Sequence, residues 1–475
     1  MITSHEYIER LKSMKKNIYM GGELVERVDP RIMPGINVIA LTYDLVNHPD
    51  YKKTLTATSH ITGKAINRFT HMHQSQEDLL KKQEMTRLLT RKSGFCIQRC
   101  MGIDAMNALS VATKEIDDAK GTEYHQRFLE YLRYWQEKDI TGCCAQTDAK
   151  GDRSLRPHQQ PDPDLYVRVV EKKKDGIVVR GAKQHITTSS FAEEIVVVPT
   201  RALKKEDADY AVAFGIPSDS EGVYIINRAS SPRKRNHLNC PLAEHGSSDG
   251  FIIFDNVFVP WNRVFMCGEY EFGGRLALLF ALFHRHSYTG CKPAVTDIIM
   301  GLTALVAEYN GVAKAQHIRE KLADLMGVAE LVYGAGIAGS INATKSLSGT
   351  FVPDPIYCNV GRRHAGENIY HEHEILTEIA GGLPATLPYE DDFFSEQTKP
   401  LLDKYMVRKE GITAEDQQRC FRCISDLNCS AFGAVWQYAG VHGGGSPIME
   451  TIAILSNYNL ELRKNLAKEL AGIKY

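Results

Sequence analysis

Two short segments of the sequence carry side chains that could hold a metal centre. The first, FCIQRC, places Cys96 and Cys100 four residues apart. On a helix these positions share one face and lie about 6 Å apart, so two thiolates could bind one soft metal there. Buried cysteines at this spacing often just fill a core, and this pair alone does not decide between the two interpretations.

The second segment, HRHSYTGCK, places His284, Tyr288 and Cys291 at positions i, i+4 and i+7 of a helix, along one stripe. His284 and Cys291 would lie about 10.5 Å apart along the axis, which is awkward for one zinc ion with bonds of about 2 Å. An iron-sulfur cluster spans that gap more easily. With Cys96 and Cys100, the segments offer three thiolates and one imidazole, which suits a cluster with one non-cysteine ligand.

Four other motifs have simpler explanations. Residues 334–339 match the dinucleotide pattern G-x-G-x-x-G, but the residues before them keep a helical period, which favours a close helix contact. Ser248 lies in a G-x-S-x-G pattern that leads into a strand, whereas a hydrolase nucleophile leads from a strand into a helix. The HEHE cluster at residues 371–374 is expected to be a solvated helix face, and Cys420 and Cys423 are expected to be buried thiols.

The composition excludes several classes of protein. Lys plus Arg is 57 and Asp plus Glu is 58, so the formal net charge of -1 offers no basic footprint for nucleic acid. The N-terminal residues lack the apolar stretch of a secretory signal, and the longest apolar run, residues 276–283, is far shorter than the roughly 20 residues of a membrane span. We therefore expect a cytoplasmic protein with no membrane partner, whose cysteines are not paired in disulfides.

Hydrophobic periodicity predicts three regions that position these motifs. Residues 1–140 are mostly helical in pattern, with Phe128 and Trp135 on one apolar face. Short β-branched strands spaced about a dozen residues apart favour a small β-barrel or sandwich in residues 141–274. Helical periods return in residues 275–475. We expect an α+β chain with an N-terminal helical domain, a middle β-barrel and a C-terminal helical domain, packed as one body.

With these regions in place, the sequence resembles the 4-hydroxyphenylacetate 3-hydroxylase family nearly end to end. The resemblance is carried by FCIQRCMGIDA and FHRHSYTGCK, together with INRFTHMHQSQEDLLKK, TDAKGDRS, DGIVVRGAKQHIT, FDNVFVPWNR, EIAGGLPATLP, HGGGSP and ELAGIK. Within the family it points to the flavin- and iron-sulfur-dependent branch of 4-hydroxybutyryl-CoA dehydratases, because the oxygen-using hydroxylases lack the cysteine set.

The resemblance implies an acyl-CoA dehydrogenase-like fold, a homotetramer built as a dimer of dimers, FAD at the subunit contacts and an acyl-CoA substrate. It also implies a 4Fe-4S cluster held by Cys96, Cys100, His284 and Cys291. The segments that match the family's flavin contacts contain Gln146, Thr147, Lys150, Asp152, Arg153, His185 and Thr187, with Ala380, Gly381 and Gly382 coming from a neighbouring chain.

The chemistry explains why such cofactors would be combined. Dehydration of a 4-hydroxyacyl thioester removes a β-proton, which no adjacent carbonyl makes acidic. The pKa of this C–H group is therefore far above that of any ordinary side-chain base. The resemblance implies a radical route in which the flavin takes one electron and the cluster acts as a Lewis acid on the leaving hydroxyl. It implies an acid/base role for Tyr288 beside the ligand His284, and it places Asp249, Lys292 and Gln98 in the same active site.

Two positions depart from the family pattern. Asp249 stands where the resemblance predicts a Glu, and Ala439 stands where it predicts a second Glu, three residues before HGGGSP. Ala439 can neither take nor give a proton. Either another group, such as Asp249, His286 or His442, serves that step, or the chain handles a different acyl-CoA or catalyses another reaction of the same radical type.

The sequence thus supports a radical hydro-lyase of the 4-hydroxybutyryl-CoA type, with or without vinylacetyl-CoA Δ-isomerase activity. A flavin-dependent phenol monooxygenase and a non-catalytic flavin and iron-sulfur electron-transfer protein stay open as alternatives.

Overall fold

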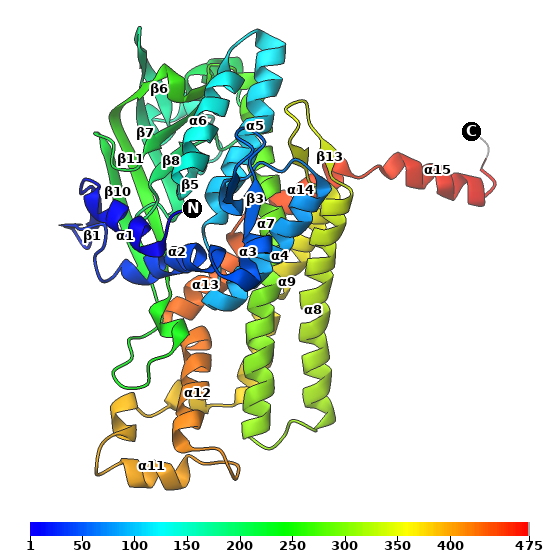
Figure 1. Cartoon of the computed structure of the whole chain (residues 1–475). Helices are drawn as coiled ribbons and strands as arrows, with labels where there is room; N and C mark the ends of the chain where they lie inside the picture. The colour runs from blue at the N-terminus through cyan, green and yellow to red at the C-terminus, as the bar shows by residue number, and fades with distance from the viewer. Residues whose placement is uncertain (474–475) are drawn as a thin grey trace.

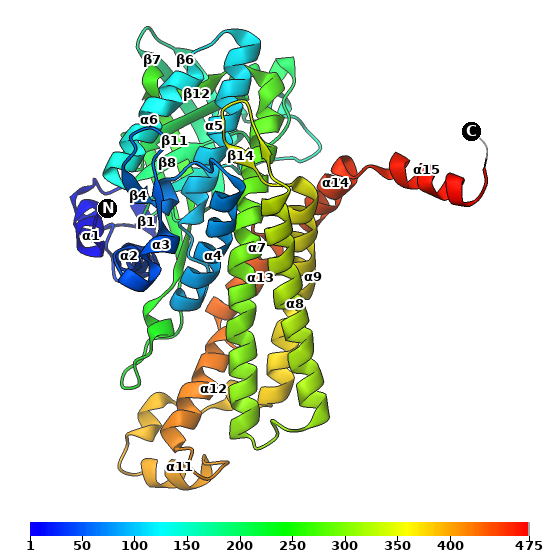
Figure 2. The ribbon, with the colours of Figure 1, turned by 45° about the vertical axis from the view of Figure 1, so that its right-hand side comes forward.

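The computed structural model describes residues 1–473. Sheets and shorter helices form one end of the molecule, and long helices run from that end to the other (Figure 1, Figure 2). The largest buried apolar cluster packs the sheets against the N-terminal helices and the start of the first long helix, α7.

The N-terminal region contains six helices and four short strands. The helices are α1 (Ser4–Ser13), α2 (Met33–Val46), α3 (Pro49–Leu55), α4 (Gln76–Ser93), α5 (Cys100–Lys120) and α6 (Tyr124–Lys138). The strands are β1 (Ile18–Met20), β2 (Glu23–Val25), β3 (Thr56–Thr58) and β4 (Ala65–Asn67). The helical pattern predicted for this region misses these strands, because each is too short for a period of two to be recognised.

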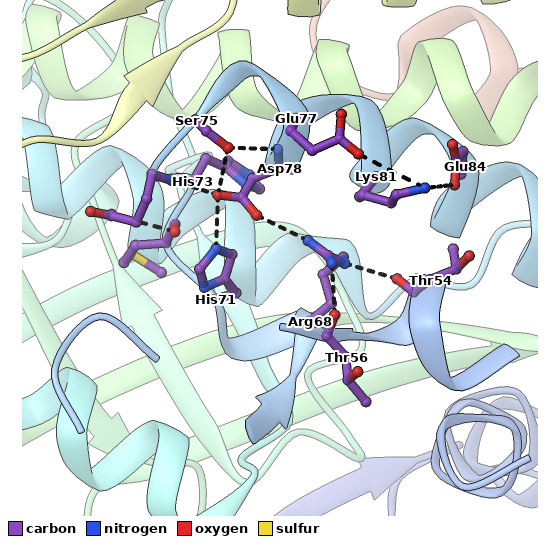
Figure 3. A network of polar contacts seen from close by, with 12 residues as sticks. Thr54, Thr56, Arg68, His71, His73, Ser75, Glu77, Asp78, Lys81 and Glu84 are labelled. Carbon is purple, nitrogen blue, oxygen red and sulfur yellow. Dashed lines mark hydrogen bonds and ion pairs between the residues drawn. The ribbon is translucent and has the colours of Figure 1, made fainter. Parts of the chain in front are cut away.

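A partly buried carboxylate fixes the start of α4, which leads into the Cys96 segment. Asp78 lies between the Arg68 guanidinium, at 3.3 Å, and the His71 ring, at 3.1 Å (Figure 3). The Ser75 side chain caps the helix by accepting a hydrogen bond from the Asp78 backbone. Burial acts to raise the pKa of Asp78, but its hydrogen bonds and the charges of His71 and Arg68 lower it to about 2.

The middle strands form two open sheets. The strands are β5 (Gly142–Ala145), β6 (Arg168–Lys172), β7 (Gly176–Thr187), β8 (Glu194–Val197), β9 (Val212–Pro217), β10 (Val223–Ser230), β11 (Ser247–Pro260) and β12 (Val264–Cys267). One sheet has the order β2-β1-β10-β11-β7-β6 and the other β12-β9-β8-β5. Among the described residues the strands do not close into a barrel, because β1 and β2 extend one edge of the larger sheet and its edge strands do not pair with each other. The expected β-barrel is therefore not confirmed.

The C-terminal region is helical, apart from a small hairpin of β13 (Thr344–Lys345) and β14 (Phe351–Val352). Its helices are α7 (Tyr270–Tyr309), α8 (Gln316–Ile341), α9 (Pro355–Ala380), α10 (Leu383–Thr386), α11 (Lys399–Tyr405), α12 (Ala414–Asn428), α13 (Ala431–His442), α14 (Pro447–Asn457) and α15 (Leu460–Leu470). α7 packs against α4, α5, α8 and α9, whereas α15 projects from the body (Figure 2). The division into three domains stays a prediction.

The glycines of segment 334–339 lie inside α8, where they permit close helix contacts. A Cβ at Gly336 would lie 2.4 Å from the Gln83 side chain, and a Cβ at Gly339 would lie 2.9 Å from the Cys358 sulfur. This confirms the interpretation of the motif as a packing feature of a helix.

Two helices, α7 and α8, are long and apolar enough to cross a membrane by length and composition alone. The core helix of a water-exposed protein meets the same criteria, and α7 carries buried charged side chains such as Arg285 and Lys292. The prediction of no membrane span rested on the longest uninterrupted apolar run. Polar residues interrupt the apolar stretches of α7 and α8, so that criterion did not identify these two helices.

We predict that Gly290→Ala destabilises the contact between α4 and α7. A Cβ at position 290 would lie 2.0 Å from the Thr86 hydroxyl and 3.0 Å from the Gln83 carbonyl. Overpacking of this kind costs about 1–3 kcal/mol. The matched control is Gly301→Ala, on the same helix, where nothing lies within 4 Å of the added Cβ. Thermal unfolding should show a lower midpoint for Gly290→Ala only, and equal midpoints for the two variants would contradict the close contact.

Candidate metal centre and active site

Cys96 and Cys100 approach each other across a loop rather than along one helix. Cys96 lies between α4 and α5, and Cys100 is the first residue of α5. The predicted shared helix is wrong because Gly94 and Gln98 both adopt left-handed backbone angles, with φ of 88° and 57°, which turn the chain. The Gln98 side chain donates a hydrogen bond to the Gly246 carbonyl at 2.9 Å, and this bond anchors the loop next to β11.

The segment HRHSYTGCK lies on α7, as the sequence predicts. α5 packs against α7, and this contact brings the loop and the helix together. Cys96 shares hydrogen bonds with Cys100 and Cys291 and lies within the electrostatic reach of His284. The Cys100 sulfur, one His284 ring nitrogen and one Asp104 oxygen all lie within 4.8 Å of one another. The structure therefore brings the four predicted ligands together.

The surroundings shift the pKa values of the three thiols in different directions. Hydrogen bonds from Cys100 and Cys291 lower the pKa of Cys96 well below its usual value. Donation to Cys96, together with burial, raises the pKa of Cys100 and of Cys291 well above that value. Protein groups alone thus stabilise one thiolate, and a bound cationic centre is needed to hold all three sulfurs as thiolates.

A buried carboxylate orients His284. The His284 Nδ1 lies 3.0 Å from an oxygen of Asp104, which is fully buried and also binds Lys82 at 2.5 Å and the Ser287 hydroxyl at 2.9 Å. An Nδ1–H that donates to this carboxylate leaves the Nε2 lone pair free for a metal. Phe280 stacks on the imidazole with an interplanar angle of 3°. Sequence reasoning missed Asp104, although its spacing of four residues from Cys100 on a helix was a usable signal.

This donor set fits a 4Fe-4S cluster. Three sulfur atoms and one imidazole nitrogen are ligands of iron-sulfur centres, and the carboxylate on the far side of the ring is a common companion of metal-bound histidine. Cys100, His284 and Cys291 are buried, and Cys96 is half-buried.

The ends of two strands carry further candidate residues beside the thiols. Asp249 on β11 pairs in register with Thr187 on β7, whose hydroxyl donates a hydrogen bond to the carboxylate at 2.6 Å. Burial raises the pKa of Asp249, and the nearby Cys96 thiolate adds to that effect. His185 lies two residues before Thr187, in a left-handed conformation with φ of 61°. Asp249, His185 and Cys96 therefore lie in one neighbourhood.

Lys292 forms a salt bridge with Glu372, a partner that the sequence did not reveal. Its ammonium lies 2.7 and 2.5 Å from the two oxygens of Glu372, which is fully buried on α9. The neighbouring His373 ring is also largely buried, with Nδ1 2.7 Å from the Asn428 side chain. The predicted solvated face is therefore wrong for these two residues of HEHE, because this side of α9 packs against α7 and α12. His371 and Glu374 are exposed, as expected.

The segment 440–445 covers the stripe of α7 that carries His284 and Tyr288. The Tyr288 hydroxyl donates a hydrogen bond to the Gly440 carbonyl at 2.9 Å, next to Ala439. Burial raises the pKa of Tyr288, so its phenol stays protonated. Arg362 lies 4.2 Å over the Tyr288 ring and donates to the Gly443 carbonyl at 2.8 Å, which holds the segment in place.

The structure places in different surroundings the residues that could take over the role of the carboxylate missing at position 439. His286 faces α8, where its Nε2 contacts the Ser340 hydroxyl at 2.8 Å, on the opposite side of α7 from His284. His442 is exposed on segment 440–445, while Asp249 lies beside the thiols. A further carboxylate, Glu450 on α14, is buried 3.5 Å from Arg362 and has a raised pKa because of its burial. The sequence gave no pattern that singled out Glu450.

The residues that match flavin contacts fall into two groups that are far apart in one chain. The Gln146 side chain donates to the Ala277 carbonyl near the start of α7, whereas Asn310, just past its end, donates to the Ile379 carbonyl. The 33 residues between positions 277 and 310 span about 50 Å as helix. A site that used both groups would need two copies of the chain.

The first of these groups offers charges suited to a diphosphate. Among residues 1–473, neither Lys150 nor Arg153 forms a salt bridge, and burial lowers the pKa of Lys150. Cations without carboxylate partners can bind phosphate oxygens. The residues of this group therefore fit a dinucleotide such as FAD.

Comparisons with known proteins agree along the whole chain. Residues 3–266 match the family model of the 4-hydroxyphenylacetate 3-hydroxylase N terminal domain, and residues 274–472 match that of the C terminal domain. The chain is 40% identical to the 4-hydroxybutyryl-CoA dehydratase/vinylacetyl-CoA-Delta-isomerase of Clostridium aminobutyricum, covering 100% of both chains. It is 30% identical to the 4-hydroxyphenylacetate 3-monooxygenase oxygenase component of Thermus thermophilus, covering 97% of this chain and 95% of that one.

Solved structures give the same result. An oxygen tolerant archaeal 4-hydroxybutyryl-CoA dehydratase from N. maritimus superposes with a TM-score of 0.95 and 38% identity, covering 100% of this chain and 95% of that one. The oxygenase component of 4-hydroxyphenylacetate 3-monooxygenase in complex with FAD superposes with a TM-score of 0.88 and 27% identity, covering 99% and 98%.

We predict that Cys100→Ser lowers the iron content of anaerobically purified protein. A 4Fe-4S cluster gives about four irons per chain, and loss of one of its thiolate ligands weakens binding. The matched control is Cys429→Ser, which removes an exposed thiol. Iron and sulfide analysis should show the loss in Cys100→Ser alone. Full iron content in that variant would remove Cys100 from the ligand set.

Proposed function

Because this chain belongs to the 4-hydroxyphenylacetate 3-hydroxylase family, we propose that it is its FAD- and 4Fe-4S-dependent kind of enzyme, a radical dehydratase of a 4-hydroxyacyl-CoA. The observation that carries the proposal is the convergence of three thiols and the Asp104-oriented His284 beside the half-buried Asp249. The relatives with the highest identity and TM-score among those compared above are 4-hydroxybutyryl-CoA dehydratases, which supports a substrate of the same type.

Two sets of residues would hold the cofactors. Cys96, Cys100, Cys291 and His284 would bind the cluster. Residues 146–153 and 185–187 of one copy, with residues 380–382 of a neighbouring copy, would bind FAD in a homotetramer. When bound, the flavin supplies one-electron chemistry and the cluster supplies a Lewis acid for the leaving hydroxyl.

Asp249 is the proposed base. Burial holds its pKa above the ordinary carboxyl range, and such a group takes up a proton more readily than an exposed aspartate. Its hydrogen bond from Thr187 fixes one carboxylate oxygen and leaves the other free for substrate. The side chain of Asp249 is one methylene shorter than the Glu expected from the family.

Tyr288 and Gln98 are proposed to position the substrate. The Tyr288 phenol is held protonated, and its oxygen keeps a lone pair for a substrate hydroxyl while its proton binds Gly440. The Gln98 Oε1 atom is buried and has no hydrogen-bond partner among residues 1–473, so it can accept a hydrogen bond from substrate. The Lys292–Glu372 pair stiffens α7 beneath them.

One observation favours a second function. Ala439 leaves no carboxylate at a position where the family pattern predicts one, which suits a flavin and iron-sulfur protein that passes electrons without dehydrating a substrate. The phenol monooxygenase alternative has less support, because the four converging cluster ligands would have no role in it.

A panel of substrates separates these functions. Anaerobically purified enzyme with its cofactors should convert 4-hydroxybutyryl-CoA to a product lighter by one water, as read by mass spectrometry of CoA esters; vinylacetyl-CoA in the same panel reports the isomerase activity. Hydroxylation of a phenol by reduced flavin and oxygen, without any CoA product, would instead support the monooxygenase. Loaded protein that does neither would support electron transfer.

We predict that Asp249→Asn lowers the dehydration rate about 10²- to 10⁴-fold, which is the usual contribution of a positioned base. Iron and flavin contents should stay unchanged. The matched control is Asp255→Asn, an exposed position on the same strand, which should keep the wild-type rate.

The pH profile gives a second readout for Asp249. A base must be deprotonated, and burial raises the pKa of Asp249, so the wild-type rate should rise with pH through a value above the ordinary aspartate range. Asp249→Asn should lose this rise. A variant that keeps both the rate and the rise would show that another group is the base.

A further inference from the structure

A second pair of thiols lies away from the cluster ligands, between α12 and the segment 231–246 that connects β10 to β11. Two contacts fasten this segment to α12. Arg419 donates to the Asn239 carbonyl at 3.0 Å, and Arg235 lies 2.7 Å from Asp426. Positions 419, 423 and 426 share one face of a helix, so the two contacts bracket Cys423.

Cys240 is placed opposite Cys423 by this clamp. The two thiols hydrogen-bond to each other, and both are partly accessible to solvent. All eleven cysteines of the chain are free thiols, so nothing in the structure already assigns this pair to a bond. Closure of a disulfide between them would need the sulfurs to approach to about 2.05 Å.

The charges around Cys240 are mainly positive. The Arg235 side chain is 5% exposed, and its Nη2 binds Asp426, while its Nη1 is buried without a hydrogen-bond partner among residues 1–473. Its guanidinium acts on the Cys240 sulfur as a nearby cation. Arg233 and Arg422 also lie against Asp426, so three guanidinium groups surround one carboxylate.

These surroundings favour the thiolate form of Cys240. The hydrogen bond from Cys423, with that of the Ala243 backbone and the charge of Arg235, lowers the pKa of Cys240 to about 5, although burial acts in the opposite direction. The same interaction raises the pKa of Cys423, which stays a protonated thiol. Thiolates in positively charged, partly accessible sites are the reactive cysteines of proteins.

We propose that Cys240 and Cys423 form a peroxide-reactive thiol pair, in which Cys240 attacks the oxidant and Cys423 resolves the product. The Cys240 thiolate attacks one oxygen of a hydroperoxide, the O–O bond breaks, and Cys240 becomes a sulfenic acid while the leaving oxygen takes a proton to give water or an alcohol. The Cys423 thiol then displaces hydroxide from the sulfenic acid, which leaves as water, and a disulfide forms. Two thiols lose two electrons, and the hydroperoxide is reduced.

The disulfide would tie the segment 231–246 to α12 covalently. This segment ends at Gly246, whose carbonyl holds the Gln98 side chain of the cluster loop, and it runs directly into the strand that carries Asp249. Oxidation of the pair would thus restrain a segment that leads directly to the active site. No cluster ligand would be oxidised in this reaction. The proposal does not depend on the identity of the substrate.

The test uses the holoenzyme treated anaerobically with equimolar hydrogen peroxide, then blocked with an alkylating reagent and digested without reduction. Mass spectrometry should find a peptide pair joined through Cys240 and Cys423 that separates on reduction. In Cys423→Ser, dimedone should label Cys240 as a trapped sulfenic acid. In Cys240→Ser, neither the joined peptides nor dimedone labelling of Cys423 should be found.

The matched control is Cys429→Ser, which removes the exposed thiol just past α12 and should leave the joined peptides as abundant as in the wild type. Iron and flavin contents equal to those of the wild type show that each variant has folded. Absence of the joined peptides in wild type, dimedone labelling at Cys423 rather than Cys240, or faster oxidation of Cys429 would each overturn the proposal.

Discussion

The buried contact of Asp104 with Lys82 and His284 is the interaction on which the site depends. Asp104 lies on α5, Lys82 on α4 and His284 on α7, so one carboxylate joins the three helices that carry or flank the candidate cluster ligands. Removal of one partner from a buried ion pair costs about 3–5 kcal/mol, because the other charge is left uncompensated. The same carboxylate decides which nitrogen of His284 faces the thiols. Packing of the helices and orientation of the ligand are therefore set by a single group.

The candidate cluster ligands and the segments that match flavin contacts place different demands on the chain. The cluster ligands come from one chain, whereas the segments that match flavin contacts lie at opposite ends of α7. Only a neighbouring copy could complete the second site in the way we propose. Segment 440–445 covers the stripe of α7 that carries His284 and Tyr288. Arg362 and Tyr288 hold this segment, and Ala439 borders it. The departure from the family pattern thus falls next to this covering segment and leaves the four ligand positions intact.

The sequence predicted those parts of the structure that depend on local periodicity. The stripe of α7 and the glycine contacts of α8 follow from helical spacing, and the structure confirms both. The loop that carries Cys96 could not be predicted from local spacing, because Gln98 adopts a left-handed angle and its side chain bonds to Gly246, which is distant in the sequence. The open sheets escaped prediction since β1 and β2 come from a region with a helical pattern. Glu372 and Glu450 are recognised only from their partners, which are far away in sequence.

X-ray diffraction from anaerobic crystals, recorded at the absorption edge of iron, tests the central claim most directly. The account predicts anomalous density for a four-iron cluster in contact with the sulfurs of Cys96, Cys100 and Cys291 and on the Nε2 side of His284, with Asp104 on Nδ1. Iron absent from this position in protein with full flavin content, or iron bound through Asp104 with the His284 ring reversed, would contradict it.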